Sequence, residues 1–169
     1  MKKLLLTLAV LSSVSPMSFS DFDSPHKEAF KKLCALVGTW EGKAGENGDG
    51  MEAKVEYRLT AGGTVLVETL FAGSPHEMVT MFHMDNNSLV CTHYCAAGNQ
   101  PHFILKPGKE KDVLEFAYVS ASNMHQNDAH MHSVKYKILD QDHIESDWQS
   151  YENNKPGMVG HFDLHRVKS

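Results

Sequence analysis

Short segments in which apolar and polar residues alternate one by one dominate this sequence, and they limit its fold more than any other feature. In residues 51–59 the apolar positions are Met51, Ala53, Val55, Tyr57 and Leu59, and the polar ones are Glu52, Lys54, Glu56 and Arg58. A period of two places the two sets on opposite faces of a β-strand. One face is then buried and the other solvated, as is common in antiparallel sheets.

Turn signals rich in Gly, Pro, Asn and Asp divide the rest of the chain into similar segments. The predicted strands cover residues 38–43, 51–59, 64–72, 76–84, 89–96, 101–106, 113–120, 130–139, 143–151 and 159–167. No helical pattern of useful length interrupts them, which argues against parallel βαβ units. The expected fold is therefore all-β, a single up-and-down antiparallel β-barrel of about eight to ten strands, closed so that no sheet edge is exposed.

One short helix is expected before the first strand. Ser24 followed by Pro25 is typical of a helix start, and apolar residues then recur at helical spacing up to Val37, before Gly38 ends the helix. We expect this helix to close or flank one end of the barrel.

The first 20 residues have the pattern of a secretory signal peptide. Lys2 and Lys3 precede an apolar run from Leu4 to Leu11, and small residues follow up to Ser20. The run is shorter than the roughly 20 residues that span a bilayer. We expect cleavage near Ser20, a domain over residues 21–169, no stable membrane anchor and a periplasmic or secreted location; an uncleaved anchor or a disordered tail is the alternative.

Charge and cysteine content narrow the function further. The formal net charge of −5 becomes −7 once Lys2 and Lys3 are removed, which argues against a nucleic-acid partner because such a partner requires a basic face. Cys91 and Cys95 lie four extended residues apart, about 13 Å, which is too far for a disulfide. A single bridge would therefore join Cys34 to one of them.

The start of the first strand and the order of the strands resemble a known group of folds. Gly38-Thr39-Trp40, followed by a meander of about ten strands, resembles the calycins: lipocalins, fatty-acid-binding proteins and nitrobindin-like haem barrels. Residues 76–80, 92–101 and 130–132 also resemble a family of uncharacterised secreted bacterial proteins. The resemblance implies a cup-shaped barrel with a pocket for a small molecule, and it brings no known activity.

Seven residues are candidates for contact with a small, largely apolar ligand: Trp40, Tyr57, Glu68, His93, Asn99, Gln100 and Trp148. Glu68 interrupts an apolar strand, and a carboxylate in an apolar cavity has a raised pKa and can act as an acid or a base. A structural Glu68 that accepts hydrogen bonds is the alternative. Asn99 and Gln100 lie in a loop, where ligand contacts are common. No nucleophile elbow, phosphate loop or zinc-protease motif is present, so the sequence favours a binding protein over an enzyme.

A metal site is the second hypothesis. Side chains two apart on a strand share a face, so His130 and His132 can converge on one ion, and His93 and Cys95 would complete a mixed site for zinc or copper. Pairing across the turn at residues 85–88 would place Thr80 opposite His93. The alternative places both histidines of the pair at the barrel rim, with His93 as a satisfied core residue.

Haem would need one axial histidine that faces the cavity. In the final strand Phe162 and Leu164 have the buried pattern, which turns His161, Asp163 and His165 outward. This leaves no clear axial histidine near the C-terminus. Zinc, copper and haem therefore all stay open as cofactors, and none is favoured.

Overall fold

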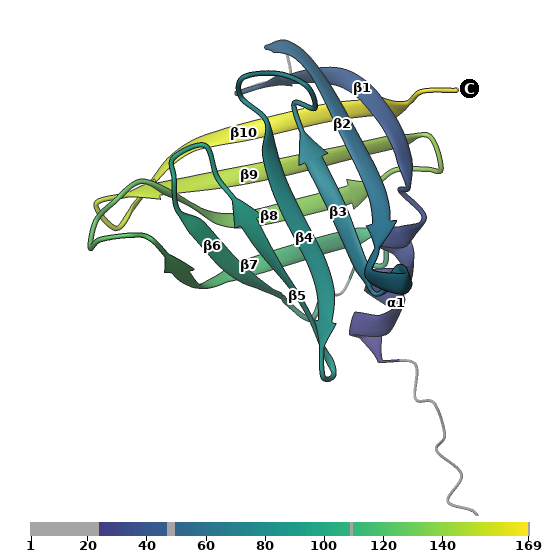
Figure 1. The fold of residues 1–169 in the computed structure, drawn as a ribbon, viewed down its shortest axis with the longest axis horizontal. Helices are drawn as coiled ribbons and strands as arrows, with labels where there is room; N and C mark the ends of the chain where they lie inside the picture. The colour runs from purple at the N-terminus through teal and green to yellow at the C-terminus, as the bar shows by residue number, and fades with distance from the viewer. Residues whose placement is uncertain (1–23, 47–49, 109, 169) are drawn as a thin grey trace, which may run out of the picture.

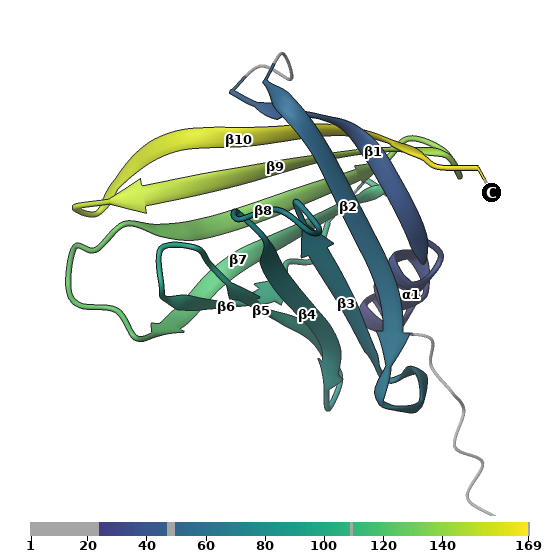
Figure 2. The ribbon, with the colours of Figure 1, turned by 45° about the horizontal axis from the view of Figure 1, so that its top comes forward.

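The computed structural model describes residues 24–46, 50–108 and 110–168, so the predicted signal peptide lies outside the described residues. The described residues form one α-helix and ten strands, and the strands pair into a closed barrel. Figure 1 shows this barrel, and Figure 2 shows the helix at one end of it. The elements are α1 (Pro25–Cys34), β1 (Gly38–Gly45), β2 (Met51–Thr60), β3 (Val65–Leu70), β4 (Met78–Asp85), β5 (Ser88–Tyr94), β6 (Gln100–Leu105), β7 (Val113–Ser122), β8 (His130–Ile138), β9 (His143–Glu152) and β10 (Lys155–Arg166), with a 3-10 turn at Ala61–Gly63. Each strand pairs antiparallel with its sequence neighbours, and β1 pairs with β10. The predicted all-β up-and-down barrel with a short N-terminal helix is confirmed. None of the described helices is long and apolar enough to cross a membrane.

The alternating pattern predicts the buried face of the strands well in their middles and poorly at their ends. Ala53, Val55 and Tyr57 of β2 are buried, whereas Met51 and Leu59 are exposed. The last strand begins at Lys155 rather than at residue 159, because the turn before it needs only two residues. Those two, Asn153 and Asn154, both adopt positive φ, as a tight hairpin turn requires.

Helix α1 closes one end of the barrel. The Ser24 side chain caps it by accepting a hydrogen bond from the Lys27 amide, and its buried residues are Ala29 and Leu33. The Leu89 amide donates to Nδ1 of His26 over 2.9 Å, which ties the helix to the β4–β5 hairpin. The expectation that the helix closes a barrel end is confirmed.

The barrel is filled at the end covered by α1 and hollow at the other. Large buried side chains that fill it are Leu33, Trp40, Leu66, Phe82, Leu89, Phe116, Tyr136, Ile144 and Leu164. Trp40 donates from its indole nitrogen to the Leu36 carbonyl over 2.7 Å, and the Arg166 guanidinium lies 4.3 Å from its ring centre. The up-and-down topology places the β1–β2, β3–β4, β5–β6, β7–β8 and β9–β10 turns together at the opposite, open end.

The three cysteines are free thiols. Cys91 lies in the barrel core, where burial raises the pKa of its thiol, while Cys34 is on α1 and Cys95 follows β5. No disulfide bridge therefore joins Cys34 to Cys91 or Cys95, and the barrel is held by packing and strand pairing.

Candidate functional site

The open end of the barrel contains a cavity of about 460 Å³. Its wall is mainly apolar and comes from eight of the strands and from the loops beside them; the larger apolar lining side chains are Met51, Leu70, Phe71, Met78, Met131, Met158 and Phe162. Gly45, Gly50 and Gly160 also line the wall and carry no side chain to fill it. Methionine side chains are flexible and polarisable, so such a wall adapts to ligands of different shape.

Two buried polar side chains, His93 and Trp148, line this cavity from β5 and β9, and the exposed His76 lines it from the loop between β3 and β4. The ring centres of His93 and Trp148 lie 4.6 Å apart, and both residues are buried. Neither Nε2 of His93 nor Nε1 of Trp148 has a hydrogen-bond partner. Within the described part of the chain, Asn99 Oδ1 is the other buried side-chain nitrogen or oxygen without a hydrogen-bond partner. Because buried polar groups are normally paired, the two nitrogens at the cavity are positions where a ligand can supply the missing partner.

A row of polar side chains runs beneath the cavity across four neighbouring strands. Tyr57 on β2 is opposite Glu68 on β3, Glu68 is opposite Thr80 on β4, and Thr80 is opposite His93 on β5. Directly opposite residues of antiparallel strands present their side chains to the same face, so strand register alone gathers these four groups. The predicted pairing of Thr80 with His93 is confirmed.

Glu68 is fully buried and accepts hydrogen bonds from two tyrosines. The Tyr57 hydroxyl lies 2.7 Å from one carboxylate oxygen, and the Tyr136 hydroxyl, which comes from β8 on the other side of the barrel, lies 3.0 and 3.1 Å from the two oxygens. Burial raises the pKa of Glu68 to about 6, although hydrogen bonds from Tyr57, Thr80 and Tyr136 act in the opposite direction. Burial and the nearby carboxylate raise the pKa of both tyrosines well above the usual value, so both stay protonated donors.

The hydrogen bonds of Thr80 determine the tautomer of His93. The Thr80 hydroxyl has one proton, its oxygen lies 3.0 Å from Nδ1 of His93, and its interaction with Glu68 lowers the pKa of that carboxyl. When the Thr80 proton is directed to Glu68, Nδ1 of His93 carries the ring proton and donates to Thr80, which leaves a lone pair on Nε2. Burial lowers the pKa of His93 to about 4, so the imidazole is neutral at physiological pH. In this tautomer the buried part of the cavity wall has one unpaired acceptor, Nε2 of His93, and one unpaired donor, the N–H of Trp148.

Of the seven residues predicted to contact a ligand, the structure places His93 and Trp148 on the cavity wall. Trp40, Tyr57 and Glu68 are buried but do not line it, and Glu68 accepts its hydrogen bonds from the hydroxyls of Tyr57 and Tyr136. Asn99 and Gln100 lie at the β5–β6 turn. Asn99 donates to the Ala129 carbonyl over 2.8 Å, and Gln100 accepts from the Ser122 hydroxyl over 3.0 Å.

The four predicted metal ligands do not come together in the structure. Met131 lines the cavity, whereas His130 and His132 do not. A bulge between Met131 and Ser133 breaks the regular register with β9. Nε2 of His130 lies 3.0 Å from Nδ1 of His132, and the His132 ring stacks between Tyr118 and Tyr151 with ring centres 4.8 and 4.0 Å away. Sequence reasoning missed the cavity residue Met158, because residues 153–157 have the composition of a turn and the strand was expected to start at residue 159.

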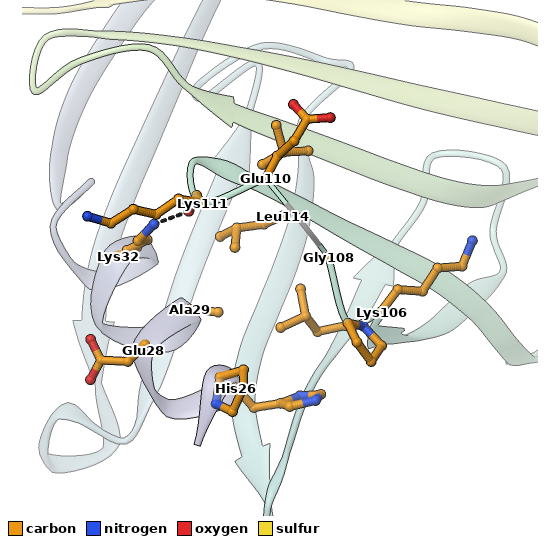
Figure 3. A pocket seen from close by; sticks show the side chains of 13 residues that line it. His26, Glu28, Ala29, Lys32, Lys106, Gly108, Glu110, Lys111 and Leu114 are labelled. Carbon is orange, nitrogen blue, oxygen red and sulfur yellow. Dashed lines mark hydrogen bonds between the residues drawn. The ribbon is translucent and has the colours of Figure 1, made fainter. Parts of the chain in front are cut away.

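A second hollow, of about 320 Å³, lies between α1 and the turn that joins β6 to β7. Figure 3 shows Ala29 and Leu114 at this hollow, with Glu28, Lys32 and Lys106 around it. Nζ of Lys32 donates to the Lys111 carbonyl and, over 3.0 Å, to the Asp112 carboxylate, which holds the helix to the turn. Charged residues surround this second hollow, and neither His93 nor Trp148, which carry the unpaired nitrogens of the open cavity, lines it.

Comparison with known proteins identifies the fold. No protein-family model matches the chain, and no curated protein sequence does. The structure is similar to the crystal structure of Rv2717c from M. tuberculosis, with a TM-score of 0.54 and 17% sequence identity over 83% of this chain and 98% of that chain. It is also similar to a protein of unknown function from the DUF3598 family of Nostoc punctiforme, with a TM-score of 0.54 and 12% identity over 80% of this chain; the match spans 48% of that protein. The chain shares the calycin-like barrel fold of both, as its sequence pattern predicts, and at these identities the likeness extends to the fold alone.

Proposed function

We propose that this protein binds a small, largely apolar molecule in the cavity at the open end of the barrel. The observation that carries the proposal is the combination of an apolar cavity with two unpaired buried nitrogens on its wall, Nε2 of His93 and Nε1 of Trp148. Binding sites for small molecules are typically apolar and contain a few such polar groups. The volume of about 460 Å³ lies within the usual range of roughly 300–1,000 Å³ for such sites.

The two nitrogens favour one kind of polar group on the ligand. Nε2 of the neutral His93 accepts a hydrogen bond, and the Trp148 indole donates one. A hydroxyl, a primary amide or a protonated carboxyl can do both. A carboxylate has no proton to give to His93 and would bring an uncompensated charge into an apolar wall. The preferred ligand therefore has an apolar body and a neutral head that both donates and accepts.

The lone pair of His93 supports a second candidate, haem binding. An unprotonated imidazole nitrogen that faces a cavity is the axial ligand that haem iron takes in many proteins. The two candidates differ in one simple observation. A haem protein develops an intense visible absorption band when it is titrated with haem, and His93→Phe removes that band. A protein that binds only colourless apolar molecules gives no such band.

The test of the main proposal is calorimetric titration with a ten-carbon alcohol, the corresponding amide, the carboxylate and the alkane. We expect the alcohol and the amide to bind more tightly than the other two, and His93→Phe to remove most of that preference, since it keeps an aromatic ring and deletes the acceptor. Binding of all four probes with equal affinity would contradict the proposed role of the two nitrogens.

A matched pair of glycine variants distinguishes the two hollows. A Cβ at Gly160 would meet its nearest atoms at 3.9 and 4.0 Å. Gly160→Leu therefore places a side chain in the cavity and reduces its free volume without a backbone clash. Gly108 lines the second hollow, and a Cβ there would meet only the Val113 carbonyl oxygen, at 3.7 Å. We expect Gly160→Leu to abolish probe binding and Gly108→Leu to leave it unchanged. The opposite result would place the site beside α1 and refute the proposal.

We also propose that the chain is exported and cleaved after residue 20, on the basis of its N-terminal pattern alone. N-terminal sequencing of the protein recovered from the periplasm or the medium should then give Asp21 as the first residue. Recovery of the protein only from the cytoplasm, with Met1 retained, would contradict it.

A further inference from the structure

Three potential metal ligands meet on the outer surface of the barrel, away from the cavity. His143 begins β9, and Asp163 and His165 lie two residues apart near the end of β10. His143 and His165 are directly opposite in the strand register. The buried residues between and beside them, Ile144 and Leu164, face the barrel core. Because successive side chains of a strand alternate in direction, the three polar side chains face outward.

The ligand atoms of these residues are already close together. Nε2 of His143 lies 2.8 Å from Oδ1 of Asp163, and Nε2 of His165 lies 3.8 Å from the same oxygen. All three ligand atoms lie within 4.8 Å of one another. Zinc bonds of about 2.0–2.1 Å in a tetrahedral arrangement put ligand atoms roughly 3.3–3.5 Å apart. Small side-chain rotations would therefore bring the three atoms to the spacing that a metal ion needs. Elsewhere in the described ranges no other set of three His, Cys, Asp or Glu residues meets this criterion.

The backbone around the three residues is well supported. Arg166, next to His165, donates to the carbonyls of Gln141, Val37 and Ala35 over 2.8–2.9 Å. Its amide donates to the Asp142 carbonyl over 2.9 Å, which joins the end of β10 to the β8–β9 turn. A site built on paired strands with fixed ends holds its ligands more accurately than a site on a loop.

The charges nearby favour a cation. The strand register places Glu41 opposite His165, and it places Glu145 and Lys43 opposite Asp163 on the two neighbouring strands. Lysines in the same region are engaged with carboxylates: Lys43 with Glu52, Lys137 with Glu145 and Lys168 with Asp142. The guanidinium of Arg166 is held over Trp40.

We propose that His143, Asp163 and His165 form a binding site for a divalent transition-metal ion of the zinc class. Two imidazoles and one carboxylate are a donor set that such ions take, and three protein ligands leave one coordination position for water or another group. This site is independent of the cavity, since neither His93 nor Trp148 belongs to it. It also differs from the His130–Met131–His132 motif that the sequence pattern singled out.

The experiment is titration of the full chain with Zn²⁺, followed by calorimetry and by NMR of the histidine rings. We expect one ion per chain, shifts in the ring signals of His143 and His165, and affinity at least about tenfold lower in both His143→Gln and His165→Gln. His161→Gln is the matched control, because His161 on β10 pairs with Asp147 on β9 over 2.7 Å, and no second histidine completes that pair to a set of three ligands. It should leave zinc affinity unchanged, as should His132→Gln.

Two results would overturn the proposal. One is a wild-type affinity weaker than about 1 mM, which is the range of nonspecific surface binding. The other is a loss of zinc binding in His132→Gln or His161→Gln while His143→Gln binds normally. The NMR readout on the wild-type protein stands even if a variant were to fold poorly.

Discussion

Acidification from pH 7 to pH 4 should weaken the folded state by about 3 kcal/mol through His93 alone. The pKa of His93 is about 4 in the folded protein, because of burial, and 6.5 is its ordinary value. Each pKa unit corresponds to about 1.4 kcal/mol, so the gap amounts to about 3 kcal/mol. In this interval the unfolded chain takes up a proton that the native imidazole does not. The stabilising contribution of neutral His93 is thus complete above pH 6.5, declines below it and is lost below about pH 4.

The assay is urea unfolding of the wild type and of His93→Asn at intervals from pH 7 to pH 4. The asparagine amide takes the place of the Nδ1–H group, can donate to Thr80 and does not titrate. At pH 7 the variant should be less stable by about 2–4 kcal/mol, because it leaves a void in the core. That difference should shrink by about 3 kcal/mol by pH 4, since only the wild type loses the His93 contribution. Two curves that stay parallel over the whole interval would refute the lowered pKa and with it the bare Nε2 at the cavity.

Three further predictions concern the buried carboxylate Glu68, the strand glycine Gly42 and the core residue Trp40. The pKa of Glu68 is raised to about 6, so its contribution is complete below pH 4.5 and about 2 kcal/mol of it is lost as the pH rises through 6. Urea unfolding of Glu68→Gln should lack this decline, and a decline of the same size in the variant would contradict it. Gly42→Ala would place a Cβ 1.9 Å from the Asp163 carbonyl oxygen and force β1 from β10, so the thermal midpoint should fall by several degrees; an unchanged midpoint would be the contrary result. Trp40→Phe leaves the Leu36 carbonyl without its donor and should lower the free energy of unfolding by about 1–3 kcal/mol, whereas equal values would show that water replaces the indole.

The barrel was predictable because its determinants are local. Alternation and turn composition lie within a few residues of each other, and the short turn at residues 85–88 correctly predicted Thr80 opposite His93. The same pattern correctly turned His161, Asp163 and His165 outward, away from Phe162 and Leu164.

The sites were predictable only in part, because they depend on contacts between distant segments. The Tyr136 hydroxyl donates to Glu68 across the barrel, although the two residues are 68 positions apart in the sequence. A pattern of neighbouring residues cannot predict a contact over such a separation. The bulge at residues 131–133 changes the register with β9, whereas the apolar pattern of β8 gives no sign of it. The sequence therefore did not predict that Met131, and not His130 or His132, lines the cavity. The contact of His143 with Asp163 and His165 likewise depends on the two-residue turn formed by Asn153 and Asn154 and on the bulge after Pro156.

The pairing of β1 with β10 has a consequence for biosynthesis. The ladder that closes the barrel joins Trp40 to Arg166, so one of its two strands is synthesised long before the other. Until the last strand emerges, the nascent chain carries an unpaired edge on β1, a surface that other extended chains can bind. Closure therefore requires synthesis of β10, and a nascent chain stopped before Lys155 retains an open sheet edge.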